Sequence, residues 1–468
     1  MCRRKIIRTR KETRMNIDKD SRTPVYIQIY NNIADGIRSG YLAPGDRLPS
    51  RRALSRDLNV AQRTVENAYM KLLSDEYITS RTGSGYYVSS DREWDAREKV
   101  LKSRIFNFST NGVETSKLPF AEWSRLMRST AREDKGLFQH GEKSGERCLR
   151  RSIRRMLYKT QGIRCTTDQI VIGPGAEDLM RDIFLLLGFG SSVVLNNYYY
   201  YRVNEIASKQ LHMDIKYVPN GPEGIDTDEL MTIEKGILFQ KPTHDLPTAV
   251  TLSEEKRRQI VNWAQGEKYV IEDGSENLYC YGEQPKTLWE LSGGRNTIYL
   301  GSFSKTIAPS MKIGYVILPE DLLLRWFKEK RYYSNRVSRV EQVTLSKFID
   351  AGHFDRHVQY MRSVYHAKTE AFRKAVEKSP LSKKCRISGC DAGMYCIMEC
   401  DIDMEEKAAN RLLRENGVKL SPLRTSMHDE AKALYAPNTY VVGYGEMTIS
   451  QIREGVEKWA AVWKELLK

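Results

Sequence analysis

Lys305 lies in the segment GSFSKTIAPSMKIGY, whose residue types favour covalent chemistry on a phosphorylated aldehyde. A deprotonated lysine amine forms a Schiff base with a carbonyl and can later leave to an incoming amine. The hydroxyls of Ser302 and Ser304 suit a phosphate, and Lys312 could add a cation. Asp273 ends the run YVIED, and its carboxylate could pair with a protonated pyridine nitrogen. The combination predicts a site for pyridoxal phosphate, although the pattern SxSK alone would more often describe a surface lysine.

A second set of residues predicts where the phosphate and the ring would lie. Gly175 and Ala176 open a helix after the apolar run 169–172, and the backbone amides of such a helix start bind phosphate. The run 196–202, NNYYYYR, is suited to covering a planar ring, although any one of its tyrosines could instead pack in the core. His244, in the string KPTHDLPTA, is a further polar candidate at the end of a strand.

The elements that must position these residues are short apolar runs that alternate with helical segments. The runs are 169–172, 192–195, 215–218, 236–239, 269–271, 297–300 and 315–318. Such alternation predicts an α/β fold with a mainly parallel sheet and helices on both faces. Ligands of such folds collect at the carboxyl ends of the strands, which is where the candidate residues fall.

The composition is typical of soluble globular material in two or three folded units. The chain has 468 residues, of which 40% are hydrophobic and 29% are charged. The formal net charge is +15, and residues 1–104 hold 22 Lys/Arg against 13 Asp/Glu, an excess of 9. This basic start predicts a polyanionic partner whose binding weakens as salt rises. No apolar run approaches the ~18 residues that span a bilayer, and no signal peptide is visible, so we expect a cytoplasmic protein with no membrane partner.

Two clusters resemble metal ligands but favour other interpretations. The eight cysteines lack the spacing of a disulfide framework, which suits a reducing compartment. Four of them, which form no paired CxxC knuckles, are Cys385, Cys390, Cys396 and Cys400. His353 and His357 share one helix face, but no carboxylate follows at ligand spacing. We therefore expect no metal site.

The first quarter of the chain predicts a winged helix-turn-helix. Apolar residues recur every four positions over 25–37, which predicts a helix. A second helix begins after Ser50 as its N-cap, and a third covers 61–76 after a short connection, so the two form a helix-turn-helix. Two β-prone runs, 77–81 and 86–89, flank TGSG and predict a hairpin wing.

The predicted DNA contacts come from the second helix, the third helix and the wing. The start of the third helix would enter the major groove, where Arg63 can offer a bidentate fork to guanine. Basic residues of the second helix can reach phosphates, and a glycine lets the wing backbone approach DNA closely. Any single arginine could instead be merely solvated. The candidate DNA-binding residues are Arg51, Arg52, Gln62, Arg63, Thr64 and Gly85.

Two charged segments flank this reader domain. The first, 1–21, is strongly basic at its start, so we expect a disordered tail, and either Met1 or Met15 could be the true start. The second, 90–104, is a charged linker, helical or extended, that would let the reader domain move relative to the rest of the chain. The expected divisions are 1–21, 22–89, 90–104 and 105–468, the last with a large part at about 160–325 and a small α+β part at about 330–468.

Long strings of the chain resemble one family. The strings PVYIQIY, PGDRLPSRRALSRDLNV and RTVENAYMKLLSDEYITSRTGSGYYV resemble the winged helix-turn-helix of GntR-type bacterial regulators. From about residue 22 the chain is similar to the MocR-type regulators, including the GabR and PdxR groups, on VIGPGAEDL, KPTHDLPTA, YVIED, IYLGSFSKTIAPSMKIGYVILP and GHFDRHVQYMR. The resemblance implies a GntR-type reader fused to a fold-type I, class I aminotransferase-like domain that forms head-to-tail homodimers.

The resemblance also implies roles for single residues. Lys305 would hold the cofactor, Asp273 would face its pyridine nitrogen, and Tyr200 would lie over the ring. The residues implied around the phosphate are Gly175, Ala176, Ser302, Ser304 and Lys312.

Several residues depart from the family pattern. Ser275 stands where relatives carry a tyrosine, and Lys312 replaces an arginine, which keeps the charge but loses the bidentate fork. Val441, in TYVVGYGE, occupies the place of the arginine that clamps a substrate carboxylate. An α-amino acid would therefore be held poorly unless Arg202 or another cation replaces that arginine. Ala61 replaces a capping Ser or Thr, which costs about 1 kcal/mol of helix stability.

These observations favour one function over two rivals. We expect a bacterial transcriptional regulator that binds pyridoxal 5'-phosphate at Lys305, reads double-stranded operator DNA and senses the cofactor, a vitamin B6 form or an amine effector. The retained Lys305 and Asp273 favour the alternative of an active aminotransferase, whereas Val441 and Ser275 weaken it, so we expect at most a residual half-reaction. The retained pair also argues against a regulator that has lost its cofactor.

Overall fold

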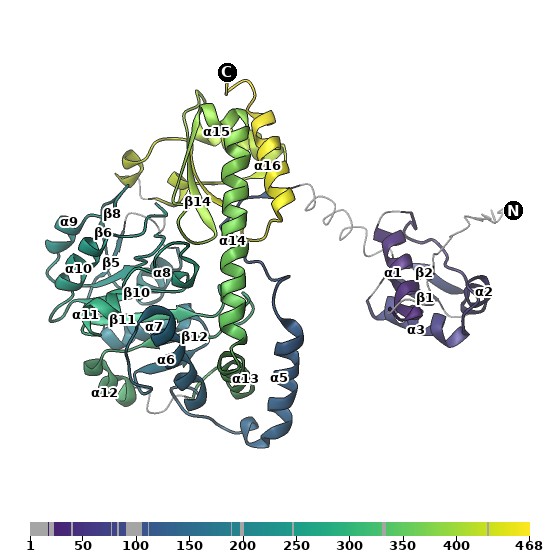
Figure 1. Ribbon diagram of the computed structural model, residues 1–468, viewed down its shortest axis with the longest axis horizontal. Coiled ribbons are helices and arrows are strands. Elements are labelled where there is room, and N and C mark those ends of the chain that lie inside the picture. The colour runs from purple at the N-terminus through teal and green to yellow at the C-terminus, as the bar shows by residue number, and fades with distance from the viewer. Residues whose placement is uncertain are drawn as a thin grey trace. The chain divides into compact units, whose positions relative to one another are not determined.

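Figure 1 shows the computed structural model of the chain. It describes residues 17, 23–38, 41–75, 77–81, 84–89, 105–110, 112–188, 190–196, 201–245, 248–329, 334–427 and 430–468. The chain divides into two compact units, Met1–Ile105 and Phe106–Lys468. Apart from Ile17, the expected tail lies outside the described residues, as do the linker 90–104 and Tyr200.

The first unit consists of three helices and a β-hairpin. Its elements are α1 (Val25–Arg38), α2 (Arg51–Asp57), α3 (Gln62–Ser74), β1 (Ile78–Arg81) and β2 (Gly85–Val88). Ile29 and Ile33 of α1 share a core with Leu54 of α2 and with Val65 and Leu72 of α3. The four-residue spacing on α1 produces this core because residues i and i+4 lie on one helix face.

The two helix starts of the helix-turn-helix are capped unequally, as the sequence predicts. The Ser50 hydroxyl accepts a hydrogen bond from the Ala53 amide at 3.2 Å and so satisfies one free amide at the start of α2. Ala61 precedes α3 and provides no side-chain cap. The start of α3, which is expected to meet DNA, therefore keeps its first amides uncapped by a side chain.

The second unit contains a seven-stranded sheet whose strands are the seven apolar runs of the sequence. In spatial order they are β4 (Ile170–Gly173), β12 (Gly314–Ile317), β11 (Thr297–Ser302), β10 (Tyr269–Asp273), β9 (Ile237–Gln240), β5 (Val193–Asn196) and β6 (Ile215–Val218). Only β12 runs antiparallel to its neighbours in this sheet. The prediction of a mainly parallel sheet is confirmed.

Helices cover both faces of this sheet because successive side chains of a strand point to opposite sides. Ile170 and Ile172 pack with α6 and α13, whereas Val171 packs on the other face with α7 and α12. The covering helices are α5 (Phe120–Glu133), α6 (Arg147–Gln161), α7 (Ala176–Leu187), α9 (Thr227–Met231), α10 (Glu254–Trp263), α11 (Leu288–Ser292), α12 (Glu320–Glu329) and α13 (Arg339–Asp350).

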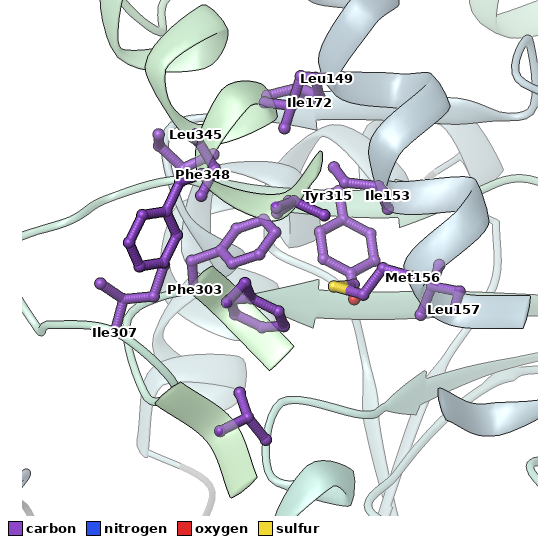
Figure 2. Close-up of a cluster of buried hydrophobic side chains, with 14 of the residues drawn as sticks. Leu149, Ile153, Met156, Leu157, Ile172, Phe303, Ile307, Tyr315, Leu345 and Phe348 are labelled. Atoms are coloured by element: carbon purple, nitrogen blue, oxygen red, sulfur yellow. The ribbon is translucent and has the colours of Figure 1, made fainter. Parts of the chain in front are cut away.

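The core on the α6 and α13 face anchors the loop that carries Lys305. Figure 2 shows Phe303 and Ile307 within this cluster, beside Tyr315 and Phe348. Both are 1% exposed, and each lies two residues from Lys305 in sequence. Buried side chains on either side hold the backbone of Lys305 in place.

A smaller sheet lies at the C-terminal part of the second unit. Its antiparallel strands, in order, are β13 (Cys385–Ser388), β14 (Tyr395–Cys400), β17 (Thr439–Gly443) and β16 (Ser421–Pro422). The remaining main elements are α8 (Tyr201–Asn204), α14 (His353–Lys378), α15 (Glu406–Glu415), α16 (Ile449–Val462), β3 (Phe106–Asn107), β7 (Asn220–Gly221), β8 (Gly224–Ile225) and β15 (Val418–Lys419). Helix α14 joins the two cores, since Met361 packs in the larger core and Phe372 packs in the smaller one.

Residues at the start of the second unit belong to this smaller part. Strand β3 pairs in parallel with β15, and Phe108 is buried in the smaller core. The smaller part is therefore built from both ends of the unit.

Candidate functional site

The carboxyl edge of the large sheet brings together residues that are far apart in sequence. The register pairs Ser302, at the end of β11, with Gly314, and pairs Gly314 with Gly173, at the end of β4. Asp273 ends β10, which lies beside β11, and Lys305 follows β11 by three residues. These five positions thus share the sheet edge at which such folds bind ligands.

The turn from β4 into α7 is closely packed and made of small residues. A Cβ atom on Gly314 would lie 3.0 Å from the carbonyl carbon of Gly175 and 3.2 Å from the nitrogen of Ala176. Gly175 has a φ of +103°, a conformation that side chains on other residues disfavour. Because the side chains here are small or absent, an anion could approach the first amides of α7.

Two acids in the first turn of α7 are each paired with arginine. Glu177 forms an ion pair with Arg202, whose side chain is 70% exposed. Asp178 contacts Arg181 at 2.9 Å and Arg336 at 2.9 Å. These partners offset the negative charge that would otherwise oppose an anion at this helix start. The structure thus places Arg202, the predicted effector-binding residue, beside the turn with Glu177 as its partner.

Of the three predicted phosphate-binding side chains, Lys312 lies beside the same turn, Ser302 ends β11, and Ser304 follows Ser302 by two residues. The Ser302 hydroxyl accepts from the Ser304 amide at 3.2 Å, so its own proton can be donated to an anion. The Ser304 hydroxyl donates to the Met311 carbonyl at 2.8 Å and would act toward an anion only after rotating. The Lys312 side chain passes the turn, since a Cβ atom on Gly175 would lie 3.9 Å from its Cδ.

Lys305 presents a partly exposed amine to this edge. Its side chain is 32% exposed, and Nζ lies 3.9 Å from Oε1 of Glu276. Its backbone carbonyl accepts a hydrogen bond from the Tyr279 hydroxyl at 3.3 Å. The side chain of Lys305 is therefore partly accessible, while the Tyr279 hydroxyl fixes its backbone carbonyl.

Sequence reasoning missed a buried ion pair behind Lys305. Lys241 Nζ lies 2.8 Å from Glu276 Oε2, and the two side chains are 6% and 7% exposed. Burial alone would raise the pKa of Glu276, but the Lys241 ammonium, with help from His244 and Lys305, holds that pKa well below its usual range. Glu276 therefore stays ionised and faces two lysines. The only sequence clue is that both residues follow strands whose ends carry predicted site residues.

His244 is buried against the same ion pair. Its Nδ1 lies 4.0 Å from Glu276 Oε2, its Nε2 lies 3.2 Å from the Gly389 carbonyl, and its ring centroid lies 4.1 Å from that of Tyr395. Burial, and secondarily Lys241, lower the pKa of His244 despite the contact with Glu276. The neutral imidazole is therefore favoured near neutral pH, and His244 is a buried polar neighbour of Glu276 rather than a cation.

Asp273 lies at the sheet edge, where its carboxylate is hydrogen-bonded to the backbone of Ser275. Its Oδ1 accepts from the Ser275 amide at 3.0 Å, and the side chain is half-buried. Ser275, which stands in place of the family tyrosine, lines a cavity of ≈ 10 Å³ with Ser302 and Thr306. That volume is about the space of one water molecule.

A second group missed from the sequence is centred on Asp245. Its Oδ2 accepts from amide groups of Asn196 at 3.1 Å, Asn220 at 3.2 Å and Gln240 at 3.1 Å, and all four residues are fully buried. Asn196 and Gln240 end β5 and β9. The carboxylate therefore ties two strand ends together beside the site.

Val441, where the sequence predicts that a carboxylate clamp has been lost, lies in apolar surroundings. This residue lies on β17, is 4% exposed, and packs in an apolar cluster with Tyr395, Ile397 and Leu423. A carboxylate placed against such a cluster would lose its hydration without gaining a cation.

The candidate DNA-binding residues gather on the helix-turn-helix and the wing of the first unit. Arg52, Gln62 and Arg63 are exposed, and Thr64 is half-buried. Arg51 forms an ion pair with Glu66 within the unit, so a phosphate would have to compete for it.

The glycine of the wing has the backbone conformation expected of a turn. Gly85 has a φ of +113°, and a Cβ atom there would lie 3.5 Å from Arg47 Nε. A glycine at this position therefore permits the strained backbone and leaves room beside a basic side chain.

The metal alternatives gain no support within the parts of the chain that the structure describes. There, no group of three or more His, Cys, Asp or Glu side chains is arranged to hold a metal ion. His357 is buried on α14, and the ring of His353 stacks on Phe348 at 5.5 Å.

Sheet, covering helices and site together define an aminotransferase-like fold joined to a winged helix-turn-helix. The chain belongs to the aminotransferase class I and II family, whose model matches residues 103–437, and residues 25–88 match the bacterial regulatory proteins of the gntR family. The predicted fold class, a gntR-type helix-turn-helix with an aminotransferase-like domain, is confirmed. Among the described helices, none has both the length and the apolar character needed to cross a membrane.

Known relatives share this organisation. The chain is 29% identical over 455 residues to the uncharacterized HTH-type transcriptional regulator YdeL of Bacillus subtilis, across 94% of this chain and 97% of the relative. It is 25% identical to the probable rhizopine catabolism regulatory protein MocR of Rhizobium meliloti, across 94% of each chain. The crystal structure of LysN, the α-aminoadipate aminotransferase of Thermus thermophilus complexed with N-(5'-phosphopyridoxyl)-L-leucine, has a TM-score of 0.67 at 22% identity, covering 79% of this chain and 95% of LysN. The predicted resemblance to MocR-type regulators is confirmed, and the chain has the organisation of an HTH-type regulator with an aminotransferase-like domain.

Proposed function

We propose that this protein is a transcriptional regulator that binds operator DNA through its first unit and pyridoxal 5'-phosphate through Lys305 in its second. The observation that carries the proposal is the convergence of Lys305, Asp273 and the turn at Gly175 on one sheet edge. The names of the relatives as HTH-type regulators support the regulatory part. Because these relatives are bacterial DNA-binding regulators, we propose that the protein acts in the cytoplasm of a bacterium.

The residues at the edge fit this cofactor. The amides at the start of α7, the Ser302 hydroxyl and the Lys312 cation can bind a phosphate, and Asp273 can hold a proton on a ring nitrogen. When bound, pyridoxal phosphate supplies an aldehyde that a lysine amine can capture and a ring that withdraws electrons. His244 and Tyr200 are the proposed wall and cover of the ring, Tyr200 by family resemblance alone.

Glu276 and Lys241 set the charge around the amine of Lys305. The ionised Glu276 carboxylate lies 3.9 Å from Lys305 Nζ and can accept or stabilise a proton there. Lys241 keeps that carboxylate ionised from the buried side. We therefore assign these two residues the role of positioning the Lys305 amine and balancing its charge, and not that of binding a ligand phosphate.

The surroundings of Val441 favour a sensor over an efficient enzyme. An apolar cluster stands where a substrate carboxylate would need a cation, so amino acids would be held weakly. The effector is then the cofactor itself, a B6 vitamer or an amine. For regulation, this ligand must bind two arrangements of the protein unequally, which a homodimer of head-to-tail type would allow.

Visible absorbance of the purified full-length protein tests the cofactor assignment. We expect wild type to retain pyridoxal phosphate absorbance after gel filtration and Lys305→Ala to lose it. The matched variant Lys312→Ala should keep the absorbance but bind roughly ten- to hundredfold more weakly, because it loses one charged phosphate contact. Identical spectra of wild type and Lys305→Ala would contradict the assignment.

Electrophoretic shifts on the DNA that flanks the gene test regulation. We expect cofactor addition to change the affinity of wild type by at least about fivefold and to leave Lys305→Ala unchanged. Sustained amino-group transfer from an α-amino acid, without any cofactor effect on DNA binding, would favour the rival aminotransferase function.

A further inference from the structure

Helix α6, in the second unit, carries a run of cations without an acidic residue. Six of its 15 residues are Lys or Arg, and none is Asp or Glu. Arg147, Arg151, Arg154 and Tyr158 follow one another at intervals of four, three and four residues, so they share one face of the helix. All four side chains are exposed. They form a stripe, called here the α6 stripe, that is about 16 Å long at the helical rise per residue.

The arginines of the α6 stripe are open to an outside anion. Within the part of the chain that the structure describes, no carboxylate forms an ion pair with Arg147, Arg151 or Arg154, whereas the neighbouring acids are paired with cations that lie off the stripe. These pairs are Glu142 and Asp168 with Arg150, Asp350 with Arg155, and Asp355 with Lys159. The negative charge around α6 is therefore already balanced by other side chains.

The C-terminal end of the stripe adds two hydrogen-bond donors. Tyr158 is 57% exposed, and the Arg164 guanidinium lies 5.9 Å from the centroid of its ring. A tyrosine hydroxyl and a guanidinium both donate to phosphate oxygens. Glu290 approaches the chain just beyond α6, where a Cβ atom on Gly162 would lie 3.4 Å from its Oε2. The stripe of positive charge therefore ends at this point.

A face that is only solvated does not require this arrangement. Like charges four residues apart on a helix, such as Arg147 and Arg151, repel each other and destabilise it. Helix α14 follows the opposite pattern, because Arg373 pairs there with Glu370 and Glu377 at three and four residues. An anionic partner would relieve the repulsion on α6 that the chain avoids on α14.

We propose that the α6 stripe binds DNA phosphates beside the operator, an inference that rests on the proposed DNA-binding function of the first unit. Each DNA strand carries one phosphate per 3.4 Å of helix axis, so a stripe of this length can follow roughly five phosphates. The 15 residues 90–104 span at most about 50 Å when fully extended. Operator binding by the first unit thus keeps the stripe at a high effective concentration near DNA.

The chemistry of the stripe favours DNA over a second copy of the chain. A twofold interface sets the same patch of each copy against the other, which would bring arginines against arginines. The centres of such interfaces are also poor in charged residues and rich in apolar ones. On α6, Tyr158 is the one large hydrophobic side chain that is exposed. DNA instead supplies the opposite charge along a line.

The salt dependence of DNA binding by the full-length protein tests the stripe. The probe is a duplex of the DNA that flanks the gene. In the triple variant Arg147→Gln, Arg151→Gln, Arg154→Gln, we expect at least about tenfold weaker binding at low salt. The slope of log affinity against log salt should become shallower by about 2–3 per chain, because three phosphate contacts are lost. The preference for this duplex over a scrambled one should stay unchanged, since phosphate contacts carry no sequence information.

A matched control removes three exposed arginines from α15 and α16, which pack on the smaller core instead of the larger one. It is the triple variant Arg411→Gln, Arg414→Gln, Arg453→Gln, which changes the net charge equally and should keep the slope of wild type. The single variant Arg151→Gln, with a slope shallower by about one, serves as the test if the first triple variant does not fold.

Three outcomes would overturn the proposal. Equal slopes in the α6 variant and its control would remove the stripe, while DNA binding by wild type would leave the proposed function standing. A change of oligomeric state in the α6 variant, seen by gel filtration, would assign this face to an interface between copies. No DNA binding by wild type at any salt concentration would overturn the proposed function, and the stripe with it.

Discussion

In the first unit, Arg52 of α2 and Arg63 of α3 are both expected to meet DNA, are exposed, and come from adjoining helices. In the second unit, Gly175 and Lys305 are 130 residues apart in sequence and reach one edge only because β4, β12 and β11 are neighbours. Behind that edge lies a buried ion pair, Lys241 with Glu276. Replacing one DNA-binding side chain of the first unit should therefore cost the fold little stability. The sheet-edge site of the second unit instead depends on buried residues that also stabilise the fold.

The largest expected effect comes from breaking the buried pair. Glu276→Gln leaves the Lys241 ammonium buried without its carboxylate, which should lower the free energy of unfolding by about 3–5 kcal/mol. Urea unfolding measures this loss. The control Glu267→Gln removes a partner of Lys235 that is 78% exposed and should produce no measurable change. A small loss in both variants would remove the contrast between buried and exposed charges.

The same pair predicts a pH dependence of stability. Lys241 holds the pKa of folded Glu276 well below its ordinary value of 4.5, although burial opposes this shift. A depressed carboxyl pKa contributes stability that is present above the unfolded value and is lost as pH falls through the folded value. The unfolding free energy of wild type should therefore fall more steeply than that of Glu276→Gln as pH drops below 4.5. Parallel pH profiles of the two proteins would contradict the assignment of charge to Glu276.

Crowding the turn at α7 should have the next largest effect. Gly314→Ala places a Cβ atom 3.0 Å from the Gly175 backbone, so we expect a loss of about 1–3 kcal/mol in stability and at least about tenfold weaker cofactor binding. Gly282→Ala is the matched control, because nothing lies within 4 Å of its added Cβ. Unfolding curves of the two variants and of wild type measure the loss of stability, and absorbance titration measures the weaker cofactor binding. Unchanged binding in Gly314→Ala would separate this turn from the phosphate.

A contact in the DNA-binding unit should affect binding without affecting the fold. Arg63→Ala should cost about 1–3 kcal/mol of operator affinity and relax the preference for one base. Arg52→Ala should instead weaken binding to all sequences and reduce the salt slope by about one phosphate contact. Competition shifts with altered operators, repeated at several salt concentrations, distinguish the two. The same salt slope in both variants as in wild type would argue against the phosphate role of Arg52.

The smallest expected effect is at the helix caps of the same unit. Ser50→Ala removes the hydroxyl that accepts from Ala53 and should cost about 1 kcal/mol of stability. Ala61→Ser restores the missing cap of α3 and should raise stability by a similar amount or less. Circular dichroism, which follows the thermal unfolding transition of this unit, would detect both changes in stability. A loss in Ala61→Ser would show that the start of α3 does not follow ordinary capping rules.

Local patterns were sufficient for much of the fold. The spacing of Ile29 and Ile33 predicted α1, Ser50 predicted the start of α2, and the apolar runs predicted every strand of the large sheet. These features depend on residues close in sequence, whose periodicity is set by the helix or strand itself. The candidate residues Lys305 and Asp273 were visible for the same reason, since Asp273 ends a predicted strand and Lys305 lies in the loop that follows another.

Other features depend on which helices and strands become neighbours, and no local pattern encodes that arrangement. The pairing of Arg51 with Glu66, the pairing of Arg202 with Glu177, and the carboxylate of Asp245 were not predicted. Each joins residues from different elements, so its existence depends on packing rather than on periodicity.

By itself, the sequence determined the helices and hairpin of the first unit, the strands of the large sheet and the residue types that can do chemistry. Only the tertiary structure decided that Ser302, Gly314 and Gly173 would lie side by side, that Glu276 would face both Lys241 and Lys305, and that Cys385 would lie opposite Cys400. The physical reason is that side-chain charge and hydrogen bonding act over a few ångströms, and it is the order of the strands that brings distant residues within that range.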